Sequence, residues 1–101
     1  MSSTPPTTSD EIRDLHKKYL FPCVANYYQQ SQPLSRGKGI HLYDPEGKEY
    51  LDFFGGILTV SLGHCDEEVN ARVKKQVDTL QHTSTLYPTP PIVMFAKRLA
   101  E

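Results

Sequence analysis

The residues best suited to chemistry form one run, His64-Cys65-Asp66-Glu67-Glu68, which offers imidazole, thiol and carboxylate groups side by side. These groups bind zinc, but zinc ligands are typically about two to five residues apart, and adjacent side chains point in different directions. The remaining histidines stand far away in no matching pattern. We therefore interpret the run as the start of a helix with solvated carboxylates, and we predict no metal site.

Two further patterns carry weaker chemical signals. Cys23 and Cys65 could act as nucleophiles beside a histidine, but only their residue type supports this role, so buried, inert thiols are expected. The stretch Gly37-Lys38-Gly39 lacks the spacing of a phosphate-binding loop, and a turn before a hairpin is predicted there. A small metal- or thiol-based enzyme remains an alternative, supported by His64 and Cys65 alone.

Composition argues against several classes of partner. The chain has 101 residues, 11 basic and 12 acidic, with a formal net charge of −1, so it lacks the positive field that gathers nucleic acid. It contains no apolar run long enough to span a membrane, no apolar export segment near its N-terminus, and only two cysteines. We predict a cytoplasmic protein that binds neither nucleic acid nor membrane.

The first elements expected along the chain are a tail and a helix. Residues 1–8 are rich in Ser, Thr and Pro and are predicted to be a flexible tail. Thr8 and Glu11 have the spacing of a capping box, and apolar residues follow at helical intervals, which predicts a helix over about 9–20. An extended connector is expected over 27–35, because this stretch is polar and contains Pro33.

A β-hairpin is the clearest local pattern. Alternating residues over 40–43 and 49–53 flank the turn sequence Asp44-Pro45-Glu46-Gly47. Gly55-Gly56 should end the second strand and allow tight curvature or close approach by another group.

Two amphipathic helices are predicted after the hairpin. One covers about 67–80, preceded by Asp66 as a possible cap, and the other begins at Thr89-Pro90-Pro91 and is still amphipathic at Glu101. The predicted helices and hairpin each have an apolar face to bury, but the chain offers few further elements to cover these faces. A lone hairpin is also only marginally stable in water. The sequence therefore predicts an α+β fragment with an N-terminal helix, a β-hairpin and two further helices, cut from something larger.

The hairpin sequence resembles the N-terminal segment of class III pyridoxal-phosphate aminotransferases. That family opens with R-G-x-G-x-x-L/V-x-D-x-E/D-G-x-x-Y/F-L/I-D, which residues 36–52 match. Its next motif, G-H-x-H-P-x-V/I, corresponds to residues 63–69, with Asp66-Glu67 in place of His-Pro. The likeness covers about residues 10–101, and the form Phe-Phe-Gly-Gly-Ile-Leu-Thr-Val over 53–60 most resembles the alanine–glyoxylate aminotransferase 2-like branch.

The resemblance implies a fold-type I enzyme of several hundred residues, usually a homodimer, that uses pyridoxal 5'-phosphate. Residues 9–101 would be its N-terminal segment, without the large cofactor-binding domain. The Schiff-base lysine and the phosphate-binding loop would lie downstream, so no catalytic residue is assigned here and the chain alone should be inactive. The implied reaction transfers an amino group from an alanine-like donor to a glyoxylate- or pyruvate-like 2-oxo acid.

The resemblance also implies roles for individual residues. Ile57 stands where 4-aminobutyrate-type relatives have an aliphatic residue and ornithine-type relatives a Tyr, so it would shape the substrate pocket. For Ile57 and the residues named next, ordinary packing in the core or at the surface remains the alternative to a role in the site. The residues implied are Ile57, Leu58 and Tyr27 for substrate binding, and Gly55, Gly56, Thr85 and Leu86 for the active-site loop and dimer interface.

One rival from another functional class remains open. The chain could be a truncated relative without catalytic activity that binds a protein partner through its exposed helix faces. An amphipathic helix without a C-terminal cap at Glu101 argues against this reading, because a small natural domain normally completes its core.

Overall fold

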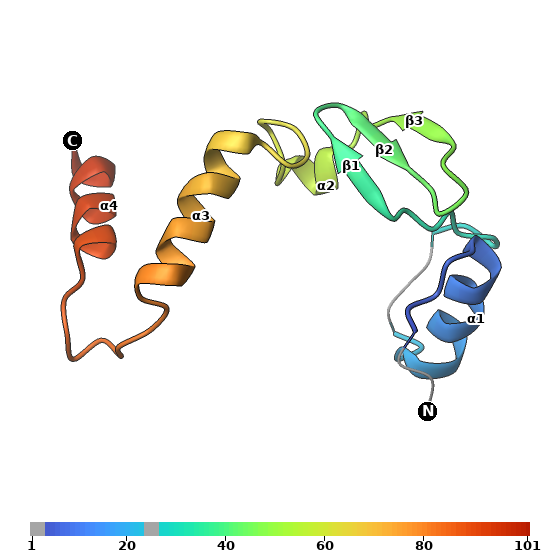
Figure 1. The fold of residues 1–101 in the computed structure, drawn as a ribbon, viewed down its shortest axis with the longest axis horizontal. Coiled ribbons are helices and arrows are strands. Elements are labelled where there is room, and N and C mark those ends of the chain that lie inside the picture. Colours follow the sequence, from blue (N-terminus) through green and yellow to red (C-terminus); the bar gives the residue numbers. More distant parts are fainter. Residues whose placement is uncertain (1–3, 24–26) are drawn as a thin grey trace. The chain divides into compact units, whose positions relative to one another are not determined.

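The computed structural model describes residues 4–23 and 27–101 in two compact units, Met1–Asp66 and Glu67–Glu101 (Figure 1). The first unit contains α1 (Ser9–Tyr19), β1 (Arg36–Lys38), β2 (His41–Tyr43), β3 (Glu49–Leu51) and the short α2 (Gly55–Leu58). The second contains α3 (Glu67–Thr79) and α4 (Pro90–Ala100). The predicted α+β content is confirmed, and no helix or strand interrupts the expected connector over 27–35.

Helix α1 begins with the predicted capping box. The Thr8 hydroxyl accepts a hydrogen bond from the Glu11 N–H at 3.3 Å, and the Glu11 carboxylate accepts one from the Thr8 N–H at 3.2 Å. Two backbone donors that the helix itself cannot pair are thereby satisfied. The Thr7 N–H also donates to Glu11, at 2.9 Å, so this part of the predicted tail contacts the helix. Residues 1–3 of that tail lie outside the described residues.

A carboxylate from the hairpin turn ties α1 to the sheet. The backbone N–H and the hydroxyl of Ser9 donate to the two carboxylate oxygens of Glu46, at 2.7 and 2.6 Å. These bonds, from the hydroxyl first and then the N–H, lower the pKa of Glu46 below its ordinary value. A negative charge at a helix N-terminus also interacts favourably with the helix dipole, so the contact stabilises the packing of α1 on the hairpin.

The strands form one antiparallel sheet in the order β1-β2-β3. His41 pairs with Leu51 and Tyr43 with Glu49, which confirms the predicted hairpin around residues 44–47. The second strand was expected to continue to residue 53, and this is wrong. β3 ends at Leu51 because the side chain of Asp52 accepts hydrogen bonds from the next backbone N–H groups and turns the chain.

The turn predicted over Gly37-Lys38-Gly39 lies further along the chain: Arg36–Lys38 form the edge strand β1, and Gly39, with a φ of +57°, and Ile40 connect it to β2. A Cβ atom built on Gly37 would lie 2.9 Å from the Cβ and Cγ atoms of His64. Glycine at this position therefore permits close approach by another segment rather than a change of direction.

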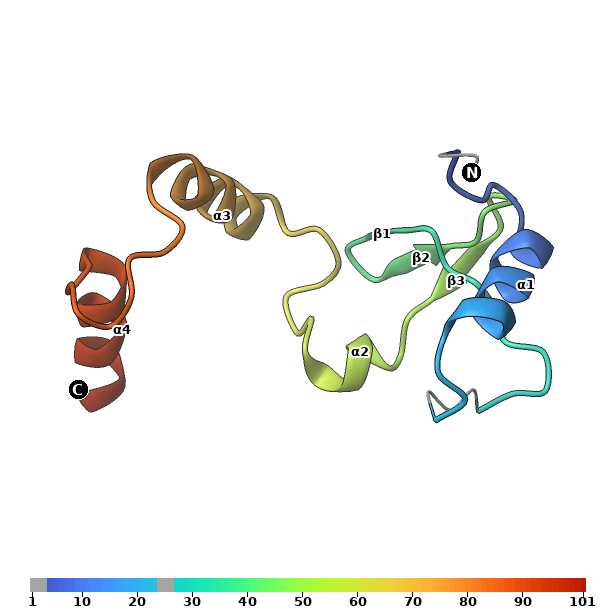
Figure 2. The same ribbon diagram turned by 90° about the horizontal axis from the view of Figure 1, so that it is seen from below.

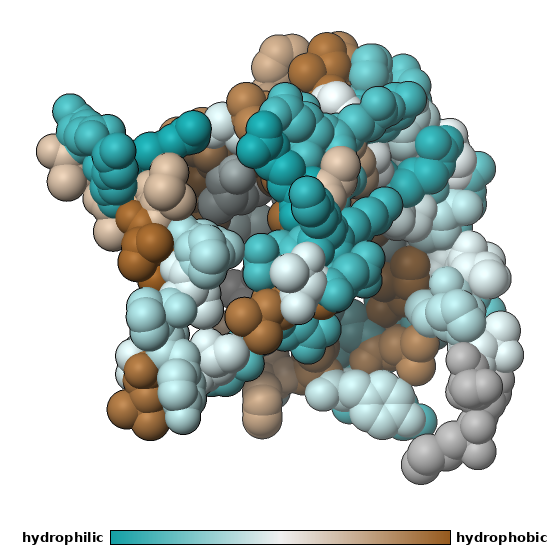
Figure 3. Space-filling view, turned by 60° about the vertical axis from the view of Figure 1, so that its left-hand side comes forward, coloured by the Kyte–Doolittle hydropathy of each residue, from teal (hydrophilic) through white to brown (hydrophobic). Residues whose placement is uncertain are grey.

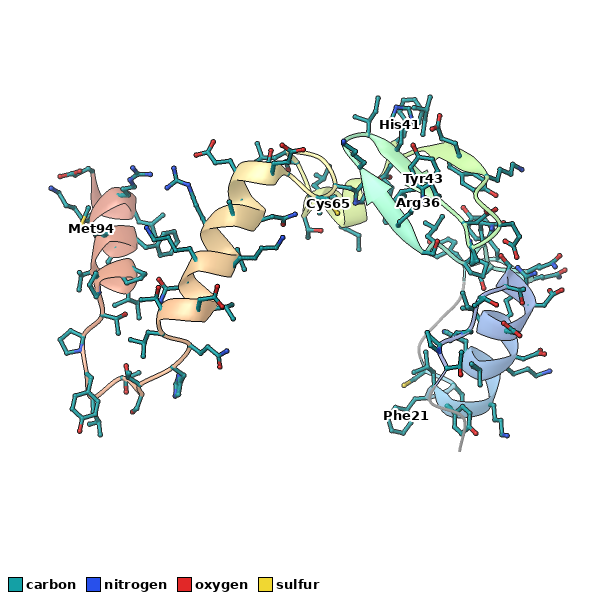
Figure 4. All side chains as sticks on the ribbon, viewed as in Figure 1. Phe21, Arg36, His41, Tyr43, Cys65 and Met94 are labelled. Carbon is teal, nitrogen blue, oxygen red and sulfur yellow. The ribbon has the colours of Figure 1, made fainter. Side chains whose placement is uncertain are left out.

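One face of the sheet carries a row of paired polar side chains. The Arg36 guanidinium lies 3.6 Å from the centre of the Tyr43 ring, and the Tyr43 hydroxyl donates to Glu49 at 2.7 Å (Figure 4). This bond raises the pKa of Tyr43. His41 Nδ1 lies 3.2 Å from a Glu49 oxygen, without the geometry of a hydrogen bond.

The second unit confirms both predicted helices. Helix α3 ends at Thr79, one residue before the expected end, and α4 begins at Pro90 after an extended Thr89 that makes no side-chain cap. Apart from Pro33, none of the apolar side chains in the described residues is buried, and Figure 3 shows apolar groups at the surface among polar ones. The expected burial of Cys23 and Cys65 is also wrong, because both residues are exposed.

Candidate functional site

The segment 53–63 forms a loop whose two ends meet at one carboxylate. Asp52 Oδ1 accepts hydrogen bonds from the N–H groups of Phe54, at 2.8 Å, and Gly55, at 2.9 Å. Its other oxygen, Oδ2, lies 2.6 Å from His64 Nε2. The Gly55 N–H, then His64, then the Phe54 N–H lower the pKa of Asp52 below its ordinary value. Asp52 is therefore ionised near neutral pH and can only accept, so His64 donates from Nε2.

His64 is itself fixed to the edge of the sheet. Its backbone pairs with Gly39 through two hydrogen bonds, at 2.9 Å for the Gly39 N–H and 2.7 Å for the His64 N–H. Its side chain lies against Gly37, where any larger residue would collide with it. Strand β1, the end of β3 and the exit of the loop are thus joined at a single histidine.

The loop carries a left-handed turn, labelled α2. Its φ angles are +58° and +59° at Gly55 and Gly56, and +62° and +63° at Ile57 and Leu58. Glycine adopts this conformation freely, but an L-residue pays about 1–2 kcal/mol for it. A β-branched residue such as Ile57 is rarely found there. Two of the three residues predicted to bind substrate are therefore held in unfavourable backbone conformations.

The left-handed turn presents two apolar side chains to the outside. Ile57 is 74% exposed and Leu58 80% exposed, and Figure 2 shows α2 away from the strands on the loop that follows β3. Local bonds close the turn: the Val60 N–H donates to the Gly55 carbonyl at 3.1 Å, and the Thr59 hydroxyl to the Gly56 carbonyl at 2.7 Å. Such a surface can supply an apolar wall but no acid, base or nucleophile.

The other predicted site residues lie elsewhere. Tyr27 belongs to the first unit, is 98% exposed, and has its ring centre 6.4 Å from that of Tyr28. Thr85 and Leu86 belong to the second unit, in a turn where the Tyr87 N–H donates to the Ser84 carbonyl at 3.4 Å. The structure brings together Gly55, Gly56, Ile57 and Leu58, and their roles in binding remain predictions.

The described residues do not form a pyridoxal-phosphate site. All seven lysines are exposed, so none is enclosed as a lysine bound to the cofactor would be: Lys17, Lys18, Lys38, Lys48, Lys74, Lys75 and Lys97. The Gly39 N–H already donates to His64 and is not free to bind phosphate. Contacts to the cofactor would therefore come from residues other than these lysines and Gly39.

Two further findings apply to the described part of the chain. Its His, Cys, Asp and Glu side chains nowhere gather in groups of three or more that could hold a metal ion. Its helices are too short or too polar to cross a membrane.

The contact between Asp52 and His64 is not predicted from the sequence. Asp52 was read as the end of a strand and His64 as part of a helix start, although both coincide with fixed positions of the family pattern. The signal that could have paired them is the combination of that aspartate with Gly37, whose missing side chain makes room for a neighbour.

Comparison with known proteins identifies the family. The sequence profile described as Aminotransferase class-III matches residues 24–101. The chain belongs to the class-III aminotransferases. This confirms the resemblance carried by the hairpin and Gly-His motifs.

Individual members of the family match most of the chain. It is 45% identical over 91 residues, 90% of its length, to the human protein named mitochondrial alanine–glyoxylate aminotransferase 2, and covers 18% of that relative. It is 38% identical over its full length to the acetylornithine aminotransferase of Myxococcus xanthus, of which it covers 24%.

A solved structure shares the fold. The taurine:2-oxoglutarate aminotransferase of Bifidobacterium kashiwanohense, determined in complex with PLP and glutamate, matches 96% of this chain with a TM-score of 0.82 and 26% identity. The chain covers 22% of that protein. This class-III aminotransferase chain therefore spans about a fifth of the length of its relatives.

Proposed function

We propose that this chain is the N-terminal part of a PLP-dependent transaminase that moves an amino group from an alanine-like donor to a glyoxylate- or pyruvate-like 2-oxo acid. The main support is its 45% identity, over 90% of its length, to a protein named alanine–glyoxylate aminotransferase 2. Other relatives are named acetylornithine aminotransferases, so the identity alone does not choose the donor, and the loop described above provides the second argument.

The loop would act as one wall of the substrate pocket. Ile57 and Leu58 offer only apolar surface, and a pocket built to bind a distal polar group must offer that group a polar partner. A short amino acid such as alanine needs no such partner. The wall would thus favour short donors and help to exclude water from the reacting centre.

The cofactor would supply the electron sink for the reaction when bound. The described residues would not hold it; they would orient the substrate beside it, with Gly55 and Gly56 permitting close approach of the backbone. In the working enzyme we place Tyr27 near the substrate, and Thr85 and Leu86 at the interface of a homodimer, next to the other subunit's site. The enzyme is proposed to work in the cytoplasm, and the 101-residue chain alone to be inactive.

The test exchanges the aliphatic wall for a polar one in the full-length enzyme. Ile57→Tyr introduces the residue that ornithine-type relatives carry at this position. The ratio of kcat/KM for ornithine to kcat/KM for alanine should rise at least about tenfold, because a hydroxyl partner now favours the longer donor. The matched control is Leu62→Tyr, which places the same side chain on an equally exposed position of the same loop.

The outcomes separate the parts of the proposal. An unchanged ratio in Ile57→Tyr would remove Ile57 from the pocket. An equal rise in Leu62→Tyr would show that any added tyrosine has this effect. A full-length enzyme that transfers no amino group from alanine to glyoxylate would contradict the substrate assignment itself.

A further inference from the structure

We propose that Asp52 and His64 are positioning residues, which clamp the two ends of loop 53–63 together and thereby hold Ile57 and Leu58 at the substrate. The inference rests on the proposed function, since it assumes that this loop faces a substrate. Neither residue is expected to touch the reacting atoms.

The contact geometry supports a clamp rather than an incidental surface pair. The side chains of Asp52 and His64 are only 8% and 20% exposed, whereas every apolar residue described apart from Pro33 is at least partly exposed. A single carboxylate accepts bonds from the loop's entry, at Phe54 and Gly55, and from its exit, at His64. Hydrogen bonds to an ionised acceptor are about twice as strong as neutral ones.

The clamp is attached to the sheet at both ends. Asp52 follows β3 directly, and its N–H donates to the Ile40 carbonyl at 2.9 Å. His64 is paired with Gly39 and lies against Gly37 of β1. Movement of the histidine side chain relative to the sheet is thus restricted by the backbone on one side and by the carboxylate on the other.

The loop needs such a clamp because the packing of its two apolar side chains does not hold it in place. Ile57 and Leu58 sit in the left-handed region yet are largely exposed, so packing within the described residues does not compensate for their backbone conformation. Backbone strain of this kind persists only where the surrounding structure fixes the chain. The bonds of Asp52 at the first residues of the turn provide that fixation.

The first experiment measures the clamp without any enzymatic readout. Amide hydrogen exchange of Phe54 and Gly55 in the full-length enzyme is compared between wild type, His64→Leu and His64→Gln. Leucine fills a similar space without a donor, whereas the glutamine amide can still donate near the position of Nε2. Exchange should become about tenfold faster in His64→Leu and stay within about twofold of wild type in His64→Gln.

The matched control is His41→Leu, which removes the other histidine–carboxylate pair of the same sheet, His41 with Glu49, and leaves the groups that bond to Asp52 in place. It should leave exchange at Phe54 and Gly55 unchanged. Exchange at Leu42 in β2 reports whether each variant keeps its sheet. Unchanged exchange at Phe54 and Gly55 in His64→Leu, with the sheet intact, would overturn the clamp.

The second experiment measures the consequence for the substrate in the full-length enzyme. His64→Leu should raise KM for the amino donor about tenfold with kcat changed by less than about twofold, because a displaced wall weakens binding without altering the reacting groups. His64→Gln should restore KM, and His41→Leu should leave it unchanged. A variant with loosened exchange but normal KM would show that the loop does not position substrate, which overturns the proposal.

Failure of the proposed function is recognised separately. A wild-type enzyme without amino-transfer activity contradicts the proposed function, and the positioning role falls with it even where the exchange data show a clamp. An active enzyme with normal KM in His64→Leu contradicts only the positioning role.

Discussion

Replacing Ile57 by glycine should stabilise the left-handed turn relative to replacing it by alanine. Both substitutions remove the same exposed side chain, so their difference isolates the backbone. An L-residue at a φ of +62° costs about 1–2 kcal/mol, which glycine avoids. Glycine also has more conformational entropy than alanine when the turn is open, and this opposes its advantage by about 0.4–1 kcal/mol. The difference favours glycine by about 0.8 kcal/mol, the midpoint of these ranges.

The assay is amide exchange at Val60, whose N–H closes the turn on the Gly55 carbonyl. A difference of about 0.8 kcal/mol corresponds to roughly fourfold greater protection in Ile57→Gly than in Ile57→Ala, when reclosing is faster than exchange. The energy concerns the local opening of the turn and requires no cooperative unfolding of the chain.

The control compares glycine with alanine at a position where the difference in amide protection should have the opposite sign. Asp14 is exposed within the right-handed helix α1, where glycine is about 0.8–1.0 kcal/mol less favourable than alanine. Asp14→Gly should therefore show less protection than Asp14→Ala at Leu20, whose N–H donates to His16 at the helix end. The strain argument would be refuted if Val60 were equally protected in Ile57→Gly and Ile57→Ala while Leu20 showed the expected difference between Asp14→Gly and Asp14→Ala.

Three further predictions concern the elements that support the loop. Because its folded pKa is lowered, Asp52 contributes stability that is complete above the ordinary value of 3.8 and is lost as the pH falls below it; the Gly55 amide chemical shift, followed by NMR, should report this loss. Gly37→Ala would place a Cβ 2.9 Å from His64 and should cost about 1–3 kcal/mol, seen as loss of the Gly39–His64 contact in NOE spectra, whereas Lys38→Ala on the same strand should keep it. Thr8→Ala should destabilise α1 by about 1 kcal/mol through loss of its cap, measured as lower helicity by circular dichroism; unchanged helicity would contradict the capping role.

Local signals in the sequence were sufficient for most elements. The capping box of Thr8 and Glu11, the turn sequence after Tyr43 and the Thr89-Pro90 start each act over a few residues, so their elements appear where the pattern predicts them. The family was likewise accessible, because its motifs combine fixed residues at fixed spacing.

The missed features all depend on contacts between distant segments. Gly37 reads as a turn residue unless one knows that His64, 27 positions later, lies against it. Asp52 ends β3 by bonding to residues ahead of it and to His64, which strand propensity does not encode. The left-handed φ of Ile57 contradicts its local preference, and such disagreement between local propensity and structure is expected at functional sites.

The most direct test of the central claim is an amino-transfer assay on the purified product of the complete reading frame that contains these 101 residues. Pyruvate formed from alanine in the presence of glyoxylate is followed with and without added pyridoxal phosphate. We predict a product about five times longer than this chain, with turnover that depends on the cofactor. A reading frame that stops after Glu101, giving a chain that folds alone and binds no pyridoxal phosphate, would contradict the enzyme and favour a module that binds a protein partner.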